Sequence, residues 1–226
     1  MKRLIQQTLV LAGILFLATS CLDIQESIYM RNDGSGKFAI TVDLEGMQNL
    51  IRLAEQFSGE QTSEQDVMEE VDINFEDLRQ KLEEQEGISQ VKTIRENNNS
   101  LLGIAFEFED VAALNRALKE INDSKEPKTD YFAFERGQLK RLNTLGIEEQ
   151  VQRKMETDID ISIDGVMLSS LLEDMSYTTK YTFEKPVKET SNPASKITNE
   201  GRTVSLTYYF FNDKNGTNSL ENNISF

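Results

Sequence analysis

The chain has 226 residues, and its 39 Asp and Glu outnumber its 24 Lys and Arg to give a formal net charge of −15. This acidic balance argues against a nucleic-acid partner, because proteins that bind nucleic acid need a basic footprint. With no His and a single Cys, the chain lacks the residues for Ser-His-Asp and Cys-His catalysis, and for zinc, haem or iron–sulfur sites ligated by His or Cys. We therefore expect no catalytic residue, no cofactor and no bound transition metal.

The first 20 residues predict a signal peptide. Lys2 and Arg3 form a positive start, and residues 9–18 are an uncharged apolar run. Ten residues are too few to cross a bilayer, which takes about 20, and suit the apolar region of a signal peptide. Residues 17–21, Leu-Ala-Thr-Ser-Cys, resemble the lipobox of bacterial lipoproteins, in which the Cys21 thiol would accept the diacylglyceryl group. The alternatives are an ordinary secretory signal with an accidental Cys, or a signal anchor.

Cleavage before Cys21 would leave residues 21–226 as one globular domain attached to a membrane through its N-terminal lipid. Two or more acyl chains give stable anchoring, since each buried methylene contributes about 0.8 kcal/mol. Removing Lys2 and Arg3 leaves 22 basic and 39 acidic residues, a net charge of −17. Leu22 follows the Cys where an Asp would be the inner-membrane retention signal of enteric bacteria. This favours a periplasm-facing protein of the outer membrane.

The N-terminal half of the domain predicts two hairpins and three helices. Strands at 24–31 and 38–44 flank a turn-forming Asn-Asp-Gly-Ser-Gly sequence, and strands at 90–96 and 101–109 flank three asparagines. Apolar residues at helical spacing predict one helix over 47–57 and another after Asn74. Asp110 is a good N-cap for a third helix carrying Val111, Leu114, Leu118 and Ile121. Residues 58–67 are polar and predict a mobile loop.

The C-terminal half also predicts a mixture of hairpin, helices and strands. A third hairpin is expected at 130–136 and 138–143 around Gly137, and helices are expected at 147–155 and 167–175. Strands are expected at 159–163, along 177–183 and at 203–211. The polar segment 185–202 between the last two predicts a second mobile loop. Hairpins mixed with strand–helix units indicate an α+β fold with a mostly antiparallel sheet and helices covering one face.

Aromatic residues supply the candidate ligand site. Seven of the 18 aromatics lie between residues 177 and 211. In the last strand Val204, Leu206, Tyr208 and Phe210 share one apolar face, and Tyr209 and Phe211 share the other. One interpretation is core on the first face and helix packing on the second. The other is a groove for an apolar ligand or partner segment, with the contact residues Tyr177, Tyr181, Tyr209 and Phe211.

Two oxygen-rich segments are candidates for calcium loops. Asp158, Asp160, Ser162 and Asp164 alternate with isoleucines, and the twelfth position counted from Asp160 is Leu171 where an EF-hand needs Glu. The alternation favours a strand with acids on its solvent face. Residues 212–216, Asn-Asp-Lys-Asn-Gly, are more typical of a hairpin turn.

Short motifs in the C-terminal part resemble LppM-like bacterial lipoprotein domains. They are residues 181–188, Tyr-Thr-Phe-Glu-Lys-Pro-Val-Lys, and 199–206, Asn-Glu-Gly-Arg-Thr-Val-Ser-Leu, together with the early turn at 33–36. Glu184 and Lys185 separate the phenylalanine and proline that adjoin in that family. The resemblance implies an envelope α+β domain with a lipid- or glycolipid-related role, and it transfers no catalytic residue.

The function expected from the sequence is therefore a lipid-anchored envelope lipoprotein with a non-catalytic binding domain. Its ligand would be a lipid or another apolar molecule. The alternative is a structural or assembly scaffold for envelope protein complexes, whose partner would be an envelope protein.

Overall fold

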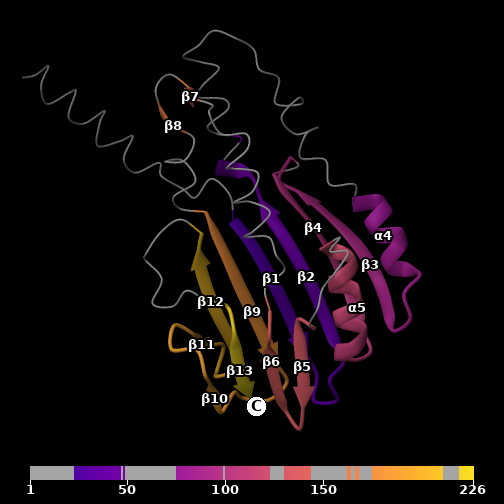
Figure 1. Ribbon diagram of the computed structural model, residues 1–226, viewed down its shortest axis with the longest axis vertical. Coiled ribbons are helices and arrows are strands. Elements are labelled where there is room, and N and C mark those ends of the chain that lie inside the picture. Colours follow the sequence, from indigo (N-terminus) through magenta and orange to yellow (C-terminus); the bar gives the residue numbers. More distant parts are fainter. Residues whose placement is uncertain are drawn as a thin grey trace, which may run out of the picture.

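The structure is a computed structural model. It describes residues 23–46, 48, 75–98, 100–122, 130–143, 162–163, 166–167, 175–210 and 219–226. The fold is α+β, and strands predominate in it over the two described helices (Figure 1). The expected helices at 47–57 and 147–155 and the loop at 58–67 lie outside the described residues, apart from residue 48.

The main layer is a seven-stranded sheet with strand order β11-β12-β9-β1-β2-β4-β3. Its strands are β1 (Asp23–Met30), β2 (Gly36–Asp43), β3 (Ile88–Glu96), β4 (Leu101–Phe108), β9 (Ser176–Phe183), β11 (Lys196–Thr198) and β12 (Thr203–Tyr209). Every pairing is antiparallel except the one between β1 and β9, which is parallel. The predicted hairpins β1–β2 and β3–β4 and the predicted strands β9 and β12 are confirmed.

Turn chemistry fixes the first hairpin. Gly34 has a φ of +91°, which residues with a side chain rarely adopt. The Asp33 carboxylate accepts a hydrogen bond of 3.0 Å from the backbone N–H of Ser35, and burial is confined to alternate residues of the strands on either side. The turn residues therefore set the register that puts one face of both strands in the core.

Helices cover one part of the buried face. α4 (Phe75–Glu83) and α5 (Val111–Ile121) both contact β3 and β4. α5 begins where the sequence predicts, because the Asp110 side chain accepts a hydrogen bond of 2.7 Å from the backbone N–H of Ala113. The apolar side chains of α5 at positions 111, 114 and 118 are buried as expected.

A second sheet covers the rest of this face. The hairpin predicted around Gly137 is confirmed as part of it, but the sequence did not predict the sheet as a whole. Its strand order is β10-β13-β6-β5, and its strands are β5 (Phe132–Glu135), β6 (Gln138–Arg141), β10 (Glu189–Thr190) and β13 (Asn222–Ser225). The ring of Phe132 meets Tyr181 of β9 at 5.8 Å between centroids, and Phe226 stacks on Phe183 at 4.2 Å. The described helices therefore share the buried face with this sheet (Figure 1).

A buried amide joins α5 to the second sheet. The Asn115 carboxamide oxygen accepts hydrogen bonds from the backbone N–H groups of Tyr131 and Phe132, at 3.0 and 2.9 Å. Its amide nitrogen donates to the Phe132 carbonyl at 2.8 Å. Asn115 thus supplies partners for backbone groups that the start of β5 would otherwise bury unpaired.

Two segments differ from their predicted form. Residues 185–202 contain the short strands β10 and β11, and the Asn192 side chain donates to the carbonyls of Ser219 and Glu221, at 3.0 Å each. These two bonds tie the segment to residues that are distant in sequence. Val166–Met167, where a helix was expected to begin, form strand β8 and pair with β7 (Ser162–Ile163).

Candidate functional site

The four aromatics predicted to bind a ligand do not lie together on a surface. Tyr177 and Tyr181 are only 2% and 1% exposed, on the face of β9 packed against the second sheet. Tyr209 is half-buried and lies on the opposite side of the main sheet, and Phe211, like Cys21, lies outside the described residues. Burial of the two tyrosines argues against their direct contact with a ligand, because the aromatic alternation that identified β9 marks core packing.

Tyr177 and Tyr181 instead belong to a buried charge cluster with Glu26 and Arg141. The Tyr177 hydroxyl donates to the Glu26 carboxylate at 2.6 Å. The Tyr181 hydroxyl donates to the other carboxylate oxygen, which also accepts a bond from the guanidinium of Arg141. The side chains of Arg141 and Glu26 are 1% and 0% exposed. The cluster joins the central strand β1 to β6 of the second sheet.

Burial dominates the electrostatics of this cluster. It raises the pKa of both tyrosines well above the ordinary value, and the negative charge of Glu26 adds to the rise. Burial opposes the charge on Arg141, but attraction to Glu26 more than offsets this and raises the pKa of the guanidinium. Both tyrosines are thus held neutral, and the Arg141 guanidinium is held charged.

Two guanidinium nitrogens of Arg141, Nε and Nη2, have no hydrogen-bond partner in the described part of the chain. The guanidinium carbon lies 5.4 Å from the ring centroid of Phe132 and 5.7 Å from that of Tyr177. Aromatic faces attract such a cation, more strongly when water is excluded. We interpret the cluster as a link between the two sheets.

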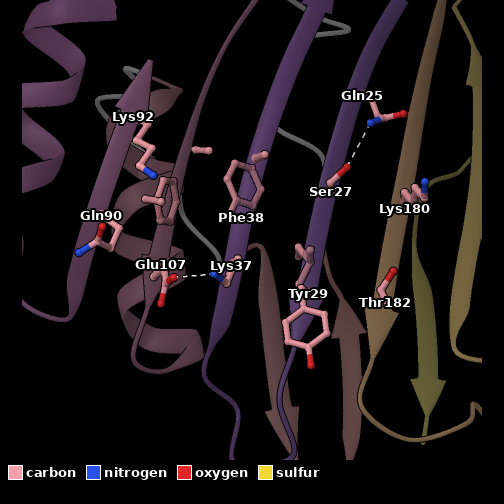
Figure 2. A pocket seen from close by; sticks show the side chains of 14 residues that line it. Gln25, Ser27, Tyr29, Lys37, Phe38, Gln90, Lys92, Glu107, Lys180 and Thr182 are labelled. Atoms are coloured by element: carbon pink, nitrogen blue, oxygen red, sulfur yellow. Dashed lines mark hydrogen bonds and ion pairs between the residues drawn. The ribbon is translucent and has the colours of Figure 1, made fainter. Parts of the chain in front are cut away.

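The opposite face of the main sheet carries a hollow of about 490 Å³. It spans five neighbouring strands, from β9 through β1, β2 and β4 to β3 (Figure 2). It is lined by Gln25, Ser27, Ile28, Tyr29, Lys37, Phe38, Ala39, Gln90, Lys92, Ala105, Phe106, Glu107, Lys180 and Thr182. Its volume lies within the range of about 300–1,000 Å³ usual for small-molecule sites.

Small side chains make the floor of the hollow. Ser27, Ala39 and Ala105 are cross-strand neighbours on β1, β2 and β4. Longer side chains stand around them, among them Gln25, Gln90 and Tyr29 (Figure 2). Tyr29 is 37% exposed and is one of the large hydrophobic residues that the surface displays. The hollow therefore exists because short side chains occupy the middle of a face whose rim carries long ones.

The charged groups of the hollow are mostly basic. The Lys37 ammonium lies 2.7 Å from the Glu107 carboxylate, and this hydrogen bond lowers the pKa of Glu107. Lys92 and Lys180 form no ion pair within the described ranges, and they lie on opposite sides of the hollow (Figure 2). Three lysines against one glutamate make it a basic surface on an acidic protein.

Sequence reasoning missed both the buried charge cluster and the hollow, although the sequence contains a signal for each. Glu26 is an acid at a buried position of an alternating strand, which calls for an opposite charge in the core. The hollow corresponds to small or basic residues at the outward positions of five strands. Finding it requires the order of the strands, and the sequence does not reveal that order.

Comparisons with known proteins add little to this geometry. No family model matches the chain, and no curated protein is similar to it. The chain is similar to the folded domain of the Mycobacterium tuberculosis protein LppM, solved by NMR, with 12% identity and a TM-score of 0.39 over 91% of this chain and 90% of that one. LppM is also the protein whose family the short C-terminal motifs resemble.

Membrane-spanning helices and metal clusters are both absent from the described residues. None of their helices is both long and apolar enough to cross a bilayer. They also contain no group of three or more Cys, Asp or Glu side chains placed to hold a metal ion. The acidic segment around Asp160 and the turn at 212–216 lie almost wholly outside the described residues, so their calcium-loop alternatives stay untested.

Proposed function

We propose that this chain is a cell-envelope lipoprotein, anchored through acylated Cys21, whose non-catalytic domain takes a ligand on the open face of its main sheet. The observation that carries the binding part is the hollow across β9, β1, β2, β4 and β3. The lipobox-like sequence before Cys21 supports the anchor, and the absence of His supports a role without general acid–base chemistry by imidazole.

The position of β1 gives the proposed anchor a structural consequence. Asp23, the first residue of β1, is two residues after Cys21. Two residues span at most about 7 Å even when fully extended. A lipidated Cys21 would therefore hold the central strand close to the membrane surface, without the long tether that would let the domain reach away from it. The hollow would lie within reach of molecules at that surface.

The ligand proposed here differs from the apolar molecule expected from the sequence. A ligand contacting Tyr177 or Tyr181 would have to enter a packed core, whose loss of contacts would cost several kcal/mol. The hollow on the other face is open and is rimmed by lysine, amide and hydroxyl groups. We therefore place a polar ligand there.

A photo-crosslinking experiment in cells tests the binding face while the ligand is still unidentified. Tyr29→p-benzoylphenylalanine puts the reactive group at the rim of the hollow, and Leu142→p-benzoylphenylalanine is the control at another exposed position, 43% accessible. Irradiated cells should give a discrete adduct of small added mass at residue 29 and none at residue 142. An adduct of protein size at residue 29 would favour the scaffold alternative, and no adduct there would refute the binding proposal.

The anchor has its own test. Cys21→Ala should abolish labelling of the protein by an alkynyl fatty acid in cells, because no other residue can accept the diacylglyceryl group. Equal labelling of the wild type and the variant would contradict the lipoprotein assignment and leave the question of the hollow unaffected.

A further inference from the structure

Cross-strand register arranges the basic groups of the open face in one line. Lys180 is paired with Ser27, Ser27 with Ala39, Ala39 with Ala105, and Ala105 with Lys92. On the other side Lys180 is paired with Ser205, and Ser205 with Lys196. The resulting lysine row crosses all seven strands and consists of Lys196, Ser205, Lys180, Ser27, Ala39, Ala105 and Lys92.

The lysine row contains no acid. Two further rows of cross-strand neighbours flank it on the same face. The row through Gln25 and Thr41 contains no charged residue. The other holds Lys37 and Glu107, which pair with each other. Four lysines and one glutamate thus give these three rows a charge of +3, in a chain whose net charge is −15. A patch of opposite sign to the rest of the molecule concentrates anions locally.

The dimensions of the lysine row favour an extended ligand. Lys180 and Lys92 lie on β9 and β3, four strand intervals apart, which is about 19 Å at a spacing of about 4.8 Å. Between them the floor consists of the small side chains Ser27, Ala39 and Ala105. A molecule lying across the strands could meet a lysine at each end and approach the sheet backbone between them.

We propose that this row binds an anionic oligosaccharide, with carboxylate or phosphate groups at the two lysine ends and sugar hydroxyls between them. This inference rests on the proposed binding face and gives its ligand a chemical class. Lysine ammonium groups pair with either anion as point charges, without a fixed geometry. The amides of Gln25 and Gln90 and the hydroxyls of Ser27 and Thr182 can both donate to and accept from sugar hydroxyls.

The same geometry disfavours the other occupants. An acidic peptide that binds by adding a strand must lie along a sheet edge, whereas the row runs across the strands in the middle of the sheet. An acyl chain would need an enclosed apolar channel, whereas the hollow is open, and among the described residues that line it Tyr29 is the one large apolar side chain that is exposed. That ring has an apolar body and a polar tip, which suits a saccharide better than a hydrocarbon.

The test uses purified full-length protein in non-ionic detergent and an array of acidic oligosaccharides, carboxylated and phosphorylated, each beside its neutral form. At least one acidic form should bind, and its neutral form should not. Binding should weaken as salt rises, because exposed charges are screened over about 8–10 Å at 0.1–0.15 M. Lys92→Gln and Lys180→Gln together should weaken it about tenfold, at two- to fivefold for each exposed ion pair.

Matched variants separate the lysine row from net charge and from folding. Arg136→Gln with Lys140→Gln removes the same charge from the β5–β6 hairpin in the other layer, where both residues are exposed, and should leave binding unchanged. Ala39→Phe should fill the hollow and abolish binding. Thr207→Phe, on the same face and outside the hollow, should not affect it.

Several results would overturn the inference while leaving the binding face intact. They are equal binding of neutral and acidic saccharides, equal loss with the hairpin control pair, or tighter binding of a polyglutamate peptide or of anionic phospholipid vesicles than of any saccharide. No saccharide binding at all would also overturn it. If the residue 29 crosslink also failed, the proposed function would fail with it.

Discussion

The two faces of the seven-stranded sheet differ in whether their charged side chains are paired. On the buried face one Glu and one Arg meet at full burial with two tyrosine hydroxyls around them. On the open face, three lysines of one row form no ion pair among the described residues. Burying an unpaired charge is costly, whereas water solvates an exposed one. The charged groups that stabilise the fold are therefore paired with each other, whereas the excess positive charge of the lysine row can attract a ligand.

The largest expected effect comes from breaking the buried pair. Arg141→Met leaves Glu26 buried without its counter-ion and should lower the free energy of unfolding by about 3–5 kcal/mol. Replacing both partners, Glu26→Leu with Arg141→Met, should lose less than the single change, because no charge is then stranded. Urea denaturation of the three proteins measures this. A single variant as stable as the wild type would mean that the pair does not link the sheets.

The next largest effect is expected from a core aromatic residue directly after β12. Phe210 is 8% exposed and belongs to the core, as its position beside Val204 and Leu206 predicts. Phe210→Ala should cost about 3–5 kcal/mol. Tyr209→Ala, on the opposite face and half-buried, should cost less than half as much. Thermal melts of the two variants test the difference between the faces, and equal losses would place both side chains in packed core.

The buried tyrosines predict a loss of stability at alkaline pH. Burial raises the pKa of Tyr177 and Tyr181, and to a smaller extent that of Tyr131, above the unfolded value. The stability that their neutral hydroxyls contribute is therefore complete below the unfolded pKa of about 10 and is lost as the pH rises above it. Tyrosinate absorbance should rise together with unfolding. In Tyr177→Phe with Tyr181→Phe, the slope of stability against pH above about 10 should be shallower.

The smallest effect is expected on the open face. Lys92→Gln and Lys180→Gln should each change the free energy of unfolding by no more than about 0.5 kcal/mol, since neither side chain has an ion-pair partner to lose among the described residues. Urea denaturation beside the Arg141 variant gives the direct contrast. A loss of more than about 1 kcal/mol would indicate that the lysine row is part of the fold.

The sequence predicted the local elements better than their assembly. Alternation and turn residues located β1, β2, β3, β4, the hairpin β5–β6, β9 and β12, and Asp110 marked the start of α5, because these signals act within a few residues of the chain. β13, Asn222–Ser225, carries no strong pattern, and its pairing with β6 is a contact between distant segments. The second sheet was missed for that reason, and with it the partner of Glu26.

The burial of two candidate site residues was missed for a related reason. Aromatic residues at alternate positions of β9 fit a groove as well as a core, and only the layer packed above them decides which. Tyr177 and Tyr181 prove to be covered by the second sheet. The hollow needs five strands in their spatial order, and one of the neighbouring pairs, β1 with β9, joins segments whose order along the chain does not suggest it.

The parallel pair β1–β9 also constrains when the domain can form. Asp23 and Ser176 pair although 153 residues separate them. In a chain exported N-terminus first, β1 would emerge early and β2 would pair with it quickly, because closing the short turn between them costs little entropy. The other edge of β1 would then stay open until β9, at residues 176–183 of 226, had also crossed. During that interval the hairpin would expose an unpaired edge and an unburied Glu26, a state prone to mispairing. Under the export that the proposed function implies, folding of the domain should therefore depend on a holding factor more than its modest size suggests.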